Sequence, residues 1–363
     1  MKTLKTSLLA CAAIIGAAWL LAIGSVSDAS AANAGAKTEK VIFAAGRPDD
    51  AWFALSHGLA TMINERSSWL EAEVLATAGI GDATRLAQRS PEKRNNHIVI
   101  TMTPGMELWA TPEYATKKVG SMGMLSTALV TLNPEIKTWA DLKGKTIALP
   151  RKVPKSYTYL YIDMLRQAGI LDTVKLRHGG TSSCLTALQD GAADAGAIMV
   201  SFTFPDNAAP GQFLEQLGTR GPVYFVEQGN VEKNIAMMAE AGKQDEFKEA
   251  AVPPLAMVAK PGSFGPAQTE PLVIMTPPVD WAAGTGVSEK MIYEVTKIMY
   301  EAAEKGEFAQ YHVIGKGMTP EFLVTSFWPT VEECRKNYHP GALKYFDERG
   351  ITLKTVSESY TKK

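Results

Sequence analysis

Short apolar runs alternate with amphipathic stretches along the first third of the chain. An apolar run that begins at Lys40 ends at Gly46, and the stretch after it repeats apolar residues at helical spacing. Asp82 stands where an N-cap would begin a second helix. The pattern predicts strands at 40–45, 72–77, 97–103 and 123–132 (one or two strands), and helices at 51–65 and 82–88. This alternation predicts βαβ units and a parallel sheet.

A second block of the same kind begins at Trp139. Its pattern predicts strands at 146–149, 173–177 and 195–200 and helices at 157–168, 182–189 and 232–248, with 213–217 and 223–227 continuing the alternation. The stretch 253–278 is rich in Pro and Gly, 287–305 carries one apolar helical stripe, and 319–350 is helical and aromatic. Two α/β blocks predict two lobes with a cleft between them.

The N-terminus has the pattern of an export signal. Lys2 and Lys5 precede an uncharged, mostly apolar run at 7–23, and Ala29-Ser30-Ala31 fits the rule for cleavage. We expect a signal peptide at 1–31, cleaved near Ala31, and a periplasmic protein; a retained N-terminal anchor is the alternative. The mature chain then keeps Cys184 and Cys334, either as one disulfide or as two separate buried thiols.

Composition and motifs exclude several classes of function. The chain has 37 basic and 38 acidic side chains, a net charge of −1, which argues against nucleic acid as a partner. The five histidines are scattered without metal-ligand spacing, and Ser and Cys residues lack a nearby base. The segment 77–84 lacks the third glycine and the acidic residue of a dinucleotide site. We therefore expect no enzyme, no metal and no cofactor.

The C-terminal segment resembles that of a known family. The sequence YHPGALKYFDERG at 338–350 resembles the HPGA-x-x-Y-x-x-E-x-G ending of the TAXI family, the substrate-binding subunits of TRAP transporters. Further matches follow the family order: Gly46 with Trp52-Phe53, DLKGK at 141–145, and LTALQDGAADA at 185–195. The loops at 47–50 and 150–158 differ, because the family usually has glycine-rich sequences there.

The resemblance implies a type II periplasmic binding protein fold, each lobe a mainly parallel sheet flanked by helices, with a hinge between the lobes. Lobe 1 would comprise 38–130 and 270–355, and lobe 2 would comprise 131–269, with crossover segments near 126–134 and 268–284. It also implies a monomer that hands its ligand to the membrane subunits of a TRAP transporter, which uses an ion gradient.

The loop at 150–158 is the best candidate for ligand binding. It joins a strand to a helix, so its amides and the helix dipole favour an anion near Ser156 and Tyr157. Arg151 and Lys155 would pair with a carboxylate. The alternative is a solvated basic turn in which Ser156 only caps the helix.

Other candidates also follow strand ends, where ligands bind in open α/β sheets. Trp52 and Phe53 either stack on a ligand or belong to the core, and the threonines at 101 and 103 either offer hydroxyls or are ordinary strand residues. The loop that begins at Thr77 lines the cleft or forms a plain turn. The full predicted ligand-binding set is Trp52, Phe53, Thr77, Ala78, Gly79, Thr101, Thr103, Arg151, Lys155, Ser156, Tyr157, Thr158 and Met199.

From these features we expect a solute-binding protein that captures a small organic anion, a carboxylate, and delivers it to a TRAP-type secondary transporter. One alternative is the binding subunit of an ABC importer for an aromatic or nitrogenous solute. A second is a periplasmic protein that senses a ligand and docks on a receptor.

Overall fold

The structure is a computed structural model of the chain. It describes residues 39–48, 50–89, 95–102, 116–152, 157–203, 207–241, 243, 256–276, 278–284, 286–326, 328 and 330–355. The predicted signal peptide and the candidates Thr103, Lys155 and Ser156 lie outside these residues.

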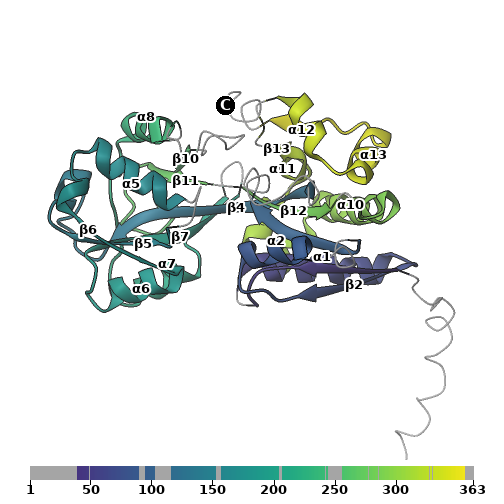
Figure 1. Ribbon diagram of the computed structural model, residues 1–363, viewed down its shortest axis with the longest axis horizontal. Helices are drawn as coiled ribbons and strands as arrows, with labels where there is room; N and C mark the ends of the chain where they lie inside the picture. Colours follow the sequence, from purple (N-terminus) through teal and green to yellow (C-terminus); the bar gives the residue numbers. More distant parts are fainter. Residues whose placement is uncertain are drawn as a thin grey trace, which may run out of the picture.

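Lobe 1 holds the first strands and the C-terminal helices (Figure 1). Its elements are β1 (Glu39–Ala44), α1 (Ala51–Arg66), β2 (Leu70–Leu75), α2 (Ile80–Arg89), β3 (His97–Met102), β12 (Pro278–Gly284), α10 (Glu289–Glu304), η4 (Glu307–Gln310), η5 (Val313–Gly317), α11 (Pro320–Val324), β13 (Thr325–Ser326), α12 (Val331–Asn337), α13 (Pro340–Glu348) and β14 (Lys354–Thr355). Strands β2, β1 and β3 are parallel, and β12 pairs antiparallel with β3.

Lobe 2 is formed by the middle of the chain, teal and green in Figure 1. Its elements are η2 (Trp139–Leu142), β5 (Thr146–Pro150), α5 (Tyr157–Gln167), η3 (Leu171–Thr173), β6 (Lys175–Gly179), α6 (Thr181–Gln189), β7 (Ala195–Thr203), β8 (Asn207–Ala209), α7 (Gln212–Gly218), β9 (Tyr224–Phe225), α8 (Val231–Ala241), β10 (Ala256–Ala259) and β11 (Leu272–Met275). Strands β7, β5 and β6 are parallel.

One long strand, β4 (Thr116–Thr131), joins the two halves of the sheet. It pairs antiparallel with β12 from Thr116 to Met124 and with β7 from Met124 to Val130, so one strand runs through both halves of the sheet. The chain returns between β11 and β12. The predicted two-lobed α/β fold is therefore confirmed, and the predicted lobe boundaries and hinge segments stay predictions.

Several predicted elements need correction. Asp82 is not an N-cap, because α2 begins at Ile80 and Asp82 lies in its first turn. The strand predicted at 123–132 is longer at its start, and the segment 213–217 lies in helix α7. The Pro/Gly-rich stretch contains β10 and β11, and the pattern also missed β12, which is buried along its whole length.

The family-like C-terminal motif holds α13 against α10. His339 is the N-cap of α13, and its Nδ1 accepts a hydrogen bond of 3.2 Å from the Gly341 amide. Pro340 takes the first helical position, where its missing N–H has no effect. A Cβ at Gly341 would lie 2.3 Å from the Glu289 carbonyl oxygen, so only glycine permits this approach of the two helices.

A buried ion pair lies beneath the C-terminal segment. Lys118 Nζ lies 3.0 Å from Asp280 Oδ1, and both side chains are fully buried. The ammonium also donates to Ser121 Oγ at 2.7 Å and to the Thr325 carbonyl at 3.0 Å. Burial acts to lower the pKa of Lys118, but the Asp280 carboxylate and the Tyr338 hydroxyl group outweigh it and raise that pKa. The pair therefore joins β4, β12 and the segment after α11.

A strained residue organises the start of lobe 2. Glu227 has φ 62°, a conformation that non-glycine residues rarely adopt, and its side chain is buried. Its Oε1 accepts from the Trp139 amide at 2.9 Å and pairs with Lys233 Nζ at 3.0 Å. Asn234 in turn accepts from the Trp139 indole N–H at 3.1 Å. These bonds anchor the segment that leads into β5.

Replacement of Gly341 by alanine tests the helix contact. We expect Gly341→Ala to lower the free energy of unfolding by about 1–3 kcal/mol, because the methyl group collides with the backbone of α10. Urea unfolding measures this. The control is Gly218→Ala at the end of α7, where an added Cβ meets nothing within 4 Å, and it should be neutral or slightly stabilising. Equal effects at both sites would contradict the packing argument.

Removal of the buried ammonium tests the ion pair. We expect Lys118→Met to cost about 3–5 kcal/mol of unfolding free energy, since it leaves the Asp280 carboxylate buried without its cation. The double variant Lys118→Met/Asp280→Leu should recover part of that loss. Lys354→Met, which removes an exposed pair with Glu321, should cost about 1 kcal/mol or less in the same urea titration. If Lys118→Met lowers the free energy of unfolding as little as Lys354→Met does, the buried pair is unimportant for stability.

Candidate functional site

The carboxyl ends of strands from both lobes converge on the middle of β4. Met102, at the end of β3, lies in register with Val279, which pairs with Gly123 of β4. Phe202, near the end of β7, pairs with the next residue of β4, Met124. Because ligands of open α/β sheets bind at the carboxyl ends of strands, this edge is the candidate site.

Four helices begin at these facing edges. Helices α1 and α2 follow β1 and β2 of lobe 1, and α5 and α6 follow β5 and β6 of lobe 2. In each lobe these strands are parallel, so the helix N-termini gather on the side that faces the other lobe. Helix N-termini favour anions, because their first N–H groups have no partner within the helix.

The N-terminus of α1 is already occupied by a carboxylate of its own loop. Asp50 accepts from the Phe53 amide at 2.9 Å through Oδ1 and from the Arg47 amide at 2.8 Å through Oδ2. A Cβ at Gly46 would lie 2.2 Å from Asp50 Oδ2, so glycine is needed where the loop closes on this side chain. Asp50 thus satisfies two amides, one in this loop and one in the first turn of α1.

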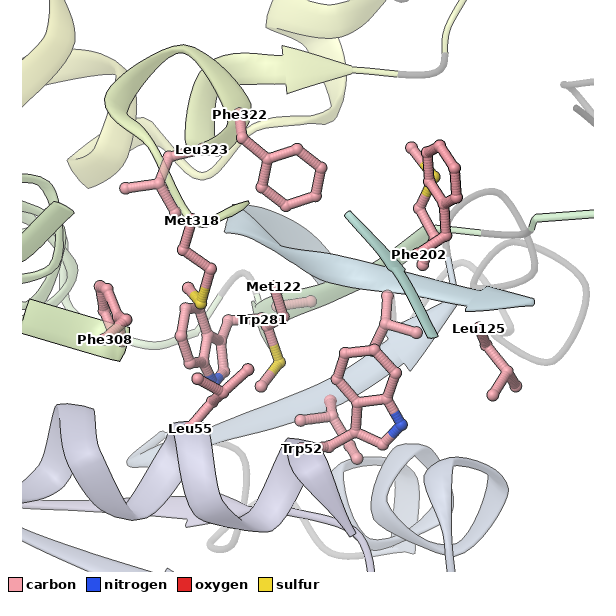
Figure 2. Close-up of a cluster of buried hydrophobic side chains, with 14 of the residues drawn as sticks. Trp52, Leu55, Met122, Leu125, Phe202, Trp281, Phe308, Met318, Phe322 and Leu323 are labelled. Atoms are coloured by element: carbon pink, nitrogen blue, oxygen red, sulfur yellow. The ribbon is translucent and has the colours of Figure 1, made fainter. Parts of the chain in front are cut away.

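The aromatic candidates on α1 differ in their surroundings. Trp52 is 5% exposed and belongs to the core cluster of buried hydrophobic side chains, part of which Figure 2 shows. Phe53 is half-buried. Trp52 therefore occupies the core position that its helical spacing allowed, and contact of either residue with a ligand stays a prediction.

The loop after β2 is a hydrogen-bonded turn. The Thr77 hydroxyl donates to the Ala45 carbonyl, and the Gly79 amide donates back to Thr77 Oγ1 at 3.4 Å. Gly79 has φ 143°, which favours glycine, and Ala78 is exposed. Thr77, Ala78 and Gly79 thus lie together at the facing edge, next to the loop that follows β1.

Thr101 lies on a different surface from these loops. It pairs directly with Asp280, so the two side chains lie on the same face of the sheet, and it is 1% exposed. Asp280 points to the Lys118 ammonium beneath the C-terminal segment. The structure therefore groups Thr101 with the buried ion pair and not with the facing-edge loops.

The loop at 150–158 is described at its two ends. Arg151 is exposed, and Tyr157 begins α5. Thr158 is fully buried, and its hydroxyl donates to the Pro150 carbonyl at 3.1 Å, which ties the helix start to the end of β5. Met199 is half-buried on β7 opposite Thr127. Ligand contacts by these residues stay predictions.

Sequence reasoning missed the start of α6 as a candidate. Its N-cap is Gly180, and no side chain in the described part of the chain caps the helix. The exposed Ser182 and the half-buried Thr181 follow at once. The signal in the sequence is G-G-T-S-S at 179–183, which lies between the predicted strand at 173–177 and the predicted helix at 182–189.

Arg47 was also missed. Its guanidinium lies 5.8 Å from the centre of the Phe213 ring, so a loop of lobe 1 reaches helix α7 of lobe 2. The two residues are far apart in the chain, and no local pattern connects them. Arg47 therefore belongs to the facing surfaces of the lobes.

The cysteines are two separate buried thiols, one in each lobe. Cys184 lies in α6 and Cys334 in α12, and neither forms a disulfide in the described structure. Burial raises the pKa of Cys184 to about 11, so the thiol is almost entirely protonated at neutral pH. Within the described residues no group of His, Cys, Asp and Glu side chains is arranged to hold a metal ion.

Comparisons with known proteins find similar architecture at low identity. No protein-family model and no curated protein matches the sequence. Among solved structures, SsuA from Methylobacillus flagellatus KT, a periplasmic sulfonate-binding protein, is 14% identical with a TM-score of 0.47, covering 88% of this chain and 89% of its own. SsuA from Escherichia coli, an aliphatic sulphonate binding protein, is 15% identical with a TM-score of 0.43, covering 85% and 83%.

A third similar structure is AF1704 from Archaeoglobus fulgidus, at 14% identity and a TM-score of 0.44, covering 86% of this chain and 98% of its own. At these values the similar structures do not identify a ligand or a partner, and the fold assignment rests on the strand pairings above. No helix among the described residues is long and apolar enough to span a membrane.

Thiol chemistry tests the burial of the cysteines. We expect the folded mature protein to react with Ellman's reagent far more slowly than the protein in urea, because both thiols are buried and the pKa of Cys184 is about 11. In the unfolded chain both thiols should react with Ellman's reagent at once, without a reductant. A need for reductant would indicate a disulfide and contradict the structure.

Proposed function

We propose that this protein is an exported periplasmic solute-binding protein that captures a small organic anion between its lobes. The observation that carries the proposal is the convergence of β3 and β7 at Gly123 and Met124, which brings helix N-termini from both lobes to one edge. Binding proteins that close around a solute use such an edge because both lobes then contribute contacts.

The anionic group of the ligand belongs with lobe 2. Asp50 already accepts from the Phe53 amide in the first turn of α1 and from the Arg47 amide before it, so lobe 1 has less to offer a carboxylate there. The start of α6 has no side-chain cap, and the exposed Arg151 follows β5 next to it. These groups suit a carboxylate, which accepts several charge-assisted hydrogen bonds.

Delivery to a TRAP-type transporter is part of the proposal and is supported by the TAXI-like C-terminus. The structure gives this motif a scaffold role, since His339, Pro340 and Gly341 begin α13 and pack it against α10. The motif therefore supports a shared framework and carries no information about the ligand. Because the proposed role is solute binding alone, we also propose that the protein is not an enzyme.

A second candidate function is a binding subunit of an ABC importer, which would take an aromatic or nitrogenous solute. The carboxylate of Asp50 at the facing edge favours this alternative, because an ammonium group would approach it favourably. Thermal-shift measurements on the mature protein distinguish the ligand classes, since a ligand that binds only the folded state raises the melting temperature. Carboxylates, aromatic acids, amino acids and amines are the probes.

The sharpest variant places a carboxylate at the start of α6. We expect Gly180→Asp to keep or raise the melting temperature, because Asp is a good N-cap, and to weaken carboxylate binding about tenfold or more by competing for the same amides. An added Cβ at this position meets only Ser183 Oγ, at 3.9 Å. Calorimetric titration with the best carboxylate of the screen measures the dissociation constant.

The matched control is Gly180→Asn, which caps the helix without a charge and should weaken binding less. If amines alone stabilise the protein, the anion proposal is wrong and the alternative holds. Proteoliposomes distinguish the transporters: uptake driven by a sodium gradient supports a TRAP partner, and uptake that needs ATP supports an ABC importer.

A further inference from the structure

The two lobes contact each other at places other than β4. Arg47, in the loop between β1 and α1, places its guanidinium 5.8 Å from the centre of the Phe213 ring on α7. Both side chains are half-buried. A cation above an aromatic face is attracted by the negative charge of the ring face, and more strongly when both groups are partly desolvated.

A second contact lies at the same part of lobe 2. Helix η5 of lobe 1 packs against β8 and β7 of lobe 2. His312 caps η5 through Nδ1, which accepts from the Ile314 amide at 3.2 Å, and it lies close enough to Glu215 for an electrostatic interaction. Glu215 and Phe213 stand on the same short helix, so both contacts of lobe 1 meet one segment, residues 207–218.

These contacts need no ligand. They join side chains of this chain to one another, and they are additional to β4, which by itself connects the two halves of the sheet. We infer that η5 and the Arg47 loop form a latch on residues 207–218 that keeps the lobes closed before a solute binds. This inference goes beyond the proposed function and does not depend on the ligand class.

A latch of this kind has a definite effect on populations. Loss of the Arg47–Phe213 contact should lower the ratio of closed to open molecules about two- to five-fold. A change of this size corresponds to the strength of a partly exposed cation–π interaction. A ligand that binds only the closed form would then bind more weakly, because its apparent dissociation constant rises as the fraction of closed molecules falls.

The experiment measures the distance between the lobes without ligand. Spin labels on Lys305→Cys, exposed in lobe 1, and Asp172→Cys, exposed in lobe 2, report that distance by pulsed electron resonance. The native cysteines are buried and stay unlabelled. We expect the mature protein to show mainly the short distance, and Arg47→Met and Phe213→Leu each to increase the long-distance population. The double variant Arg47→Met/Phe213→Leu should show little more long-distance population than either single variant, because each single change already removes the Arg47–Phe213 contact.

The matched control is Lys344→Met. Lys344 Nζ lies 5.8 Å from the centre of the Tyr293 ring, the same separation, but both residues belong to lobe 1. This variant should leave the distance distribution unchanged. A wild-type protein that is mainly open without ligand overturns the latch, and so does a closed protein on which Arg47→Met and Phe213→Leu have no effect. Because no solute is present, failure of the anion proposal would leave this result unaffected.

Discussion

The buried pair of Lys118 and Asp280 is the interaction on which the arrangement of this protein depends. Taking two charges out of water costs more than one contact returns, so the pair is tolerated only because Ser121 and the Thr325 carbonyl complete the ammonium's hydrogen bonds. Any slip of β4 against β12, or of the C-terminal segment against both, would leave a charge buried without its partner. We therefore regard the pair as a device that fixes register more than one that adds stability.

That fixed register determines where a site can form. Lys118 lies near the start of β4, and the same strand continues to the point where β3 and β7 end at Gly123 and Met124. The C-terminal motif acts on the same strand, since the His339 amide donates to the Lys118 carbonyl at 2.8 Å. The C-terminal segment thus helps to hold the strand whose middle forms the facing edge.

The sequence was informative wherever structure depends on neighbours in the chain. The strand at β1, the helix that follows it and the stripe of α10 were predictable from spacing alone. Strand β12 was not, because it is buried on both faces and carries a buried aspartate, so it shows no alternation. At the site, the uncapped glycine of α6 was visible in the sequence, whereas the meeting of Arg47 with Phe213 depends on how two lobes pack and has no local signal.

The loop at 46–50 carries charged side chains where a glycine-rich loop would have none, and these side chains make two kinds of contact. A glycine-rich loop would leave its backbone amides free for a ligand, as at helix N-termini that bind anions. Here Asp50 turns inward and binds those amides, while Arg47 turns outward to the ring of Phe213. In this loop a carboxylate of the chain therefore accepts from two amides, and a neighbouring guanidinium contacts lobe 2. This division is consistent with the proposal of an anion site at the start of α6 and with the inferred latch between the lobes.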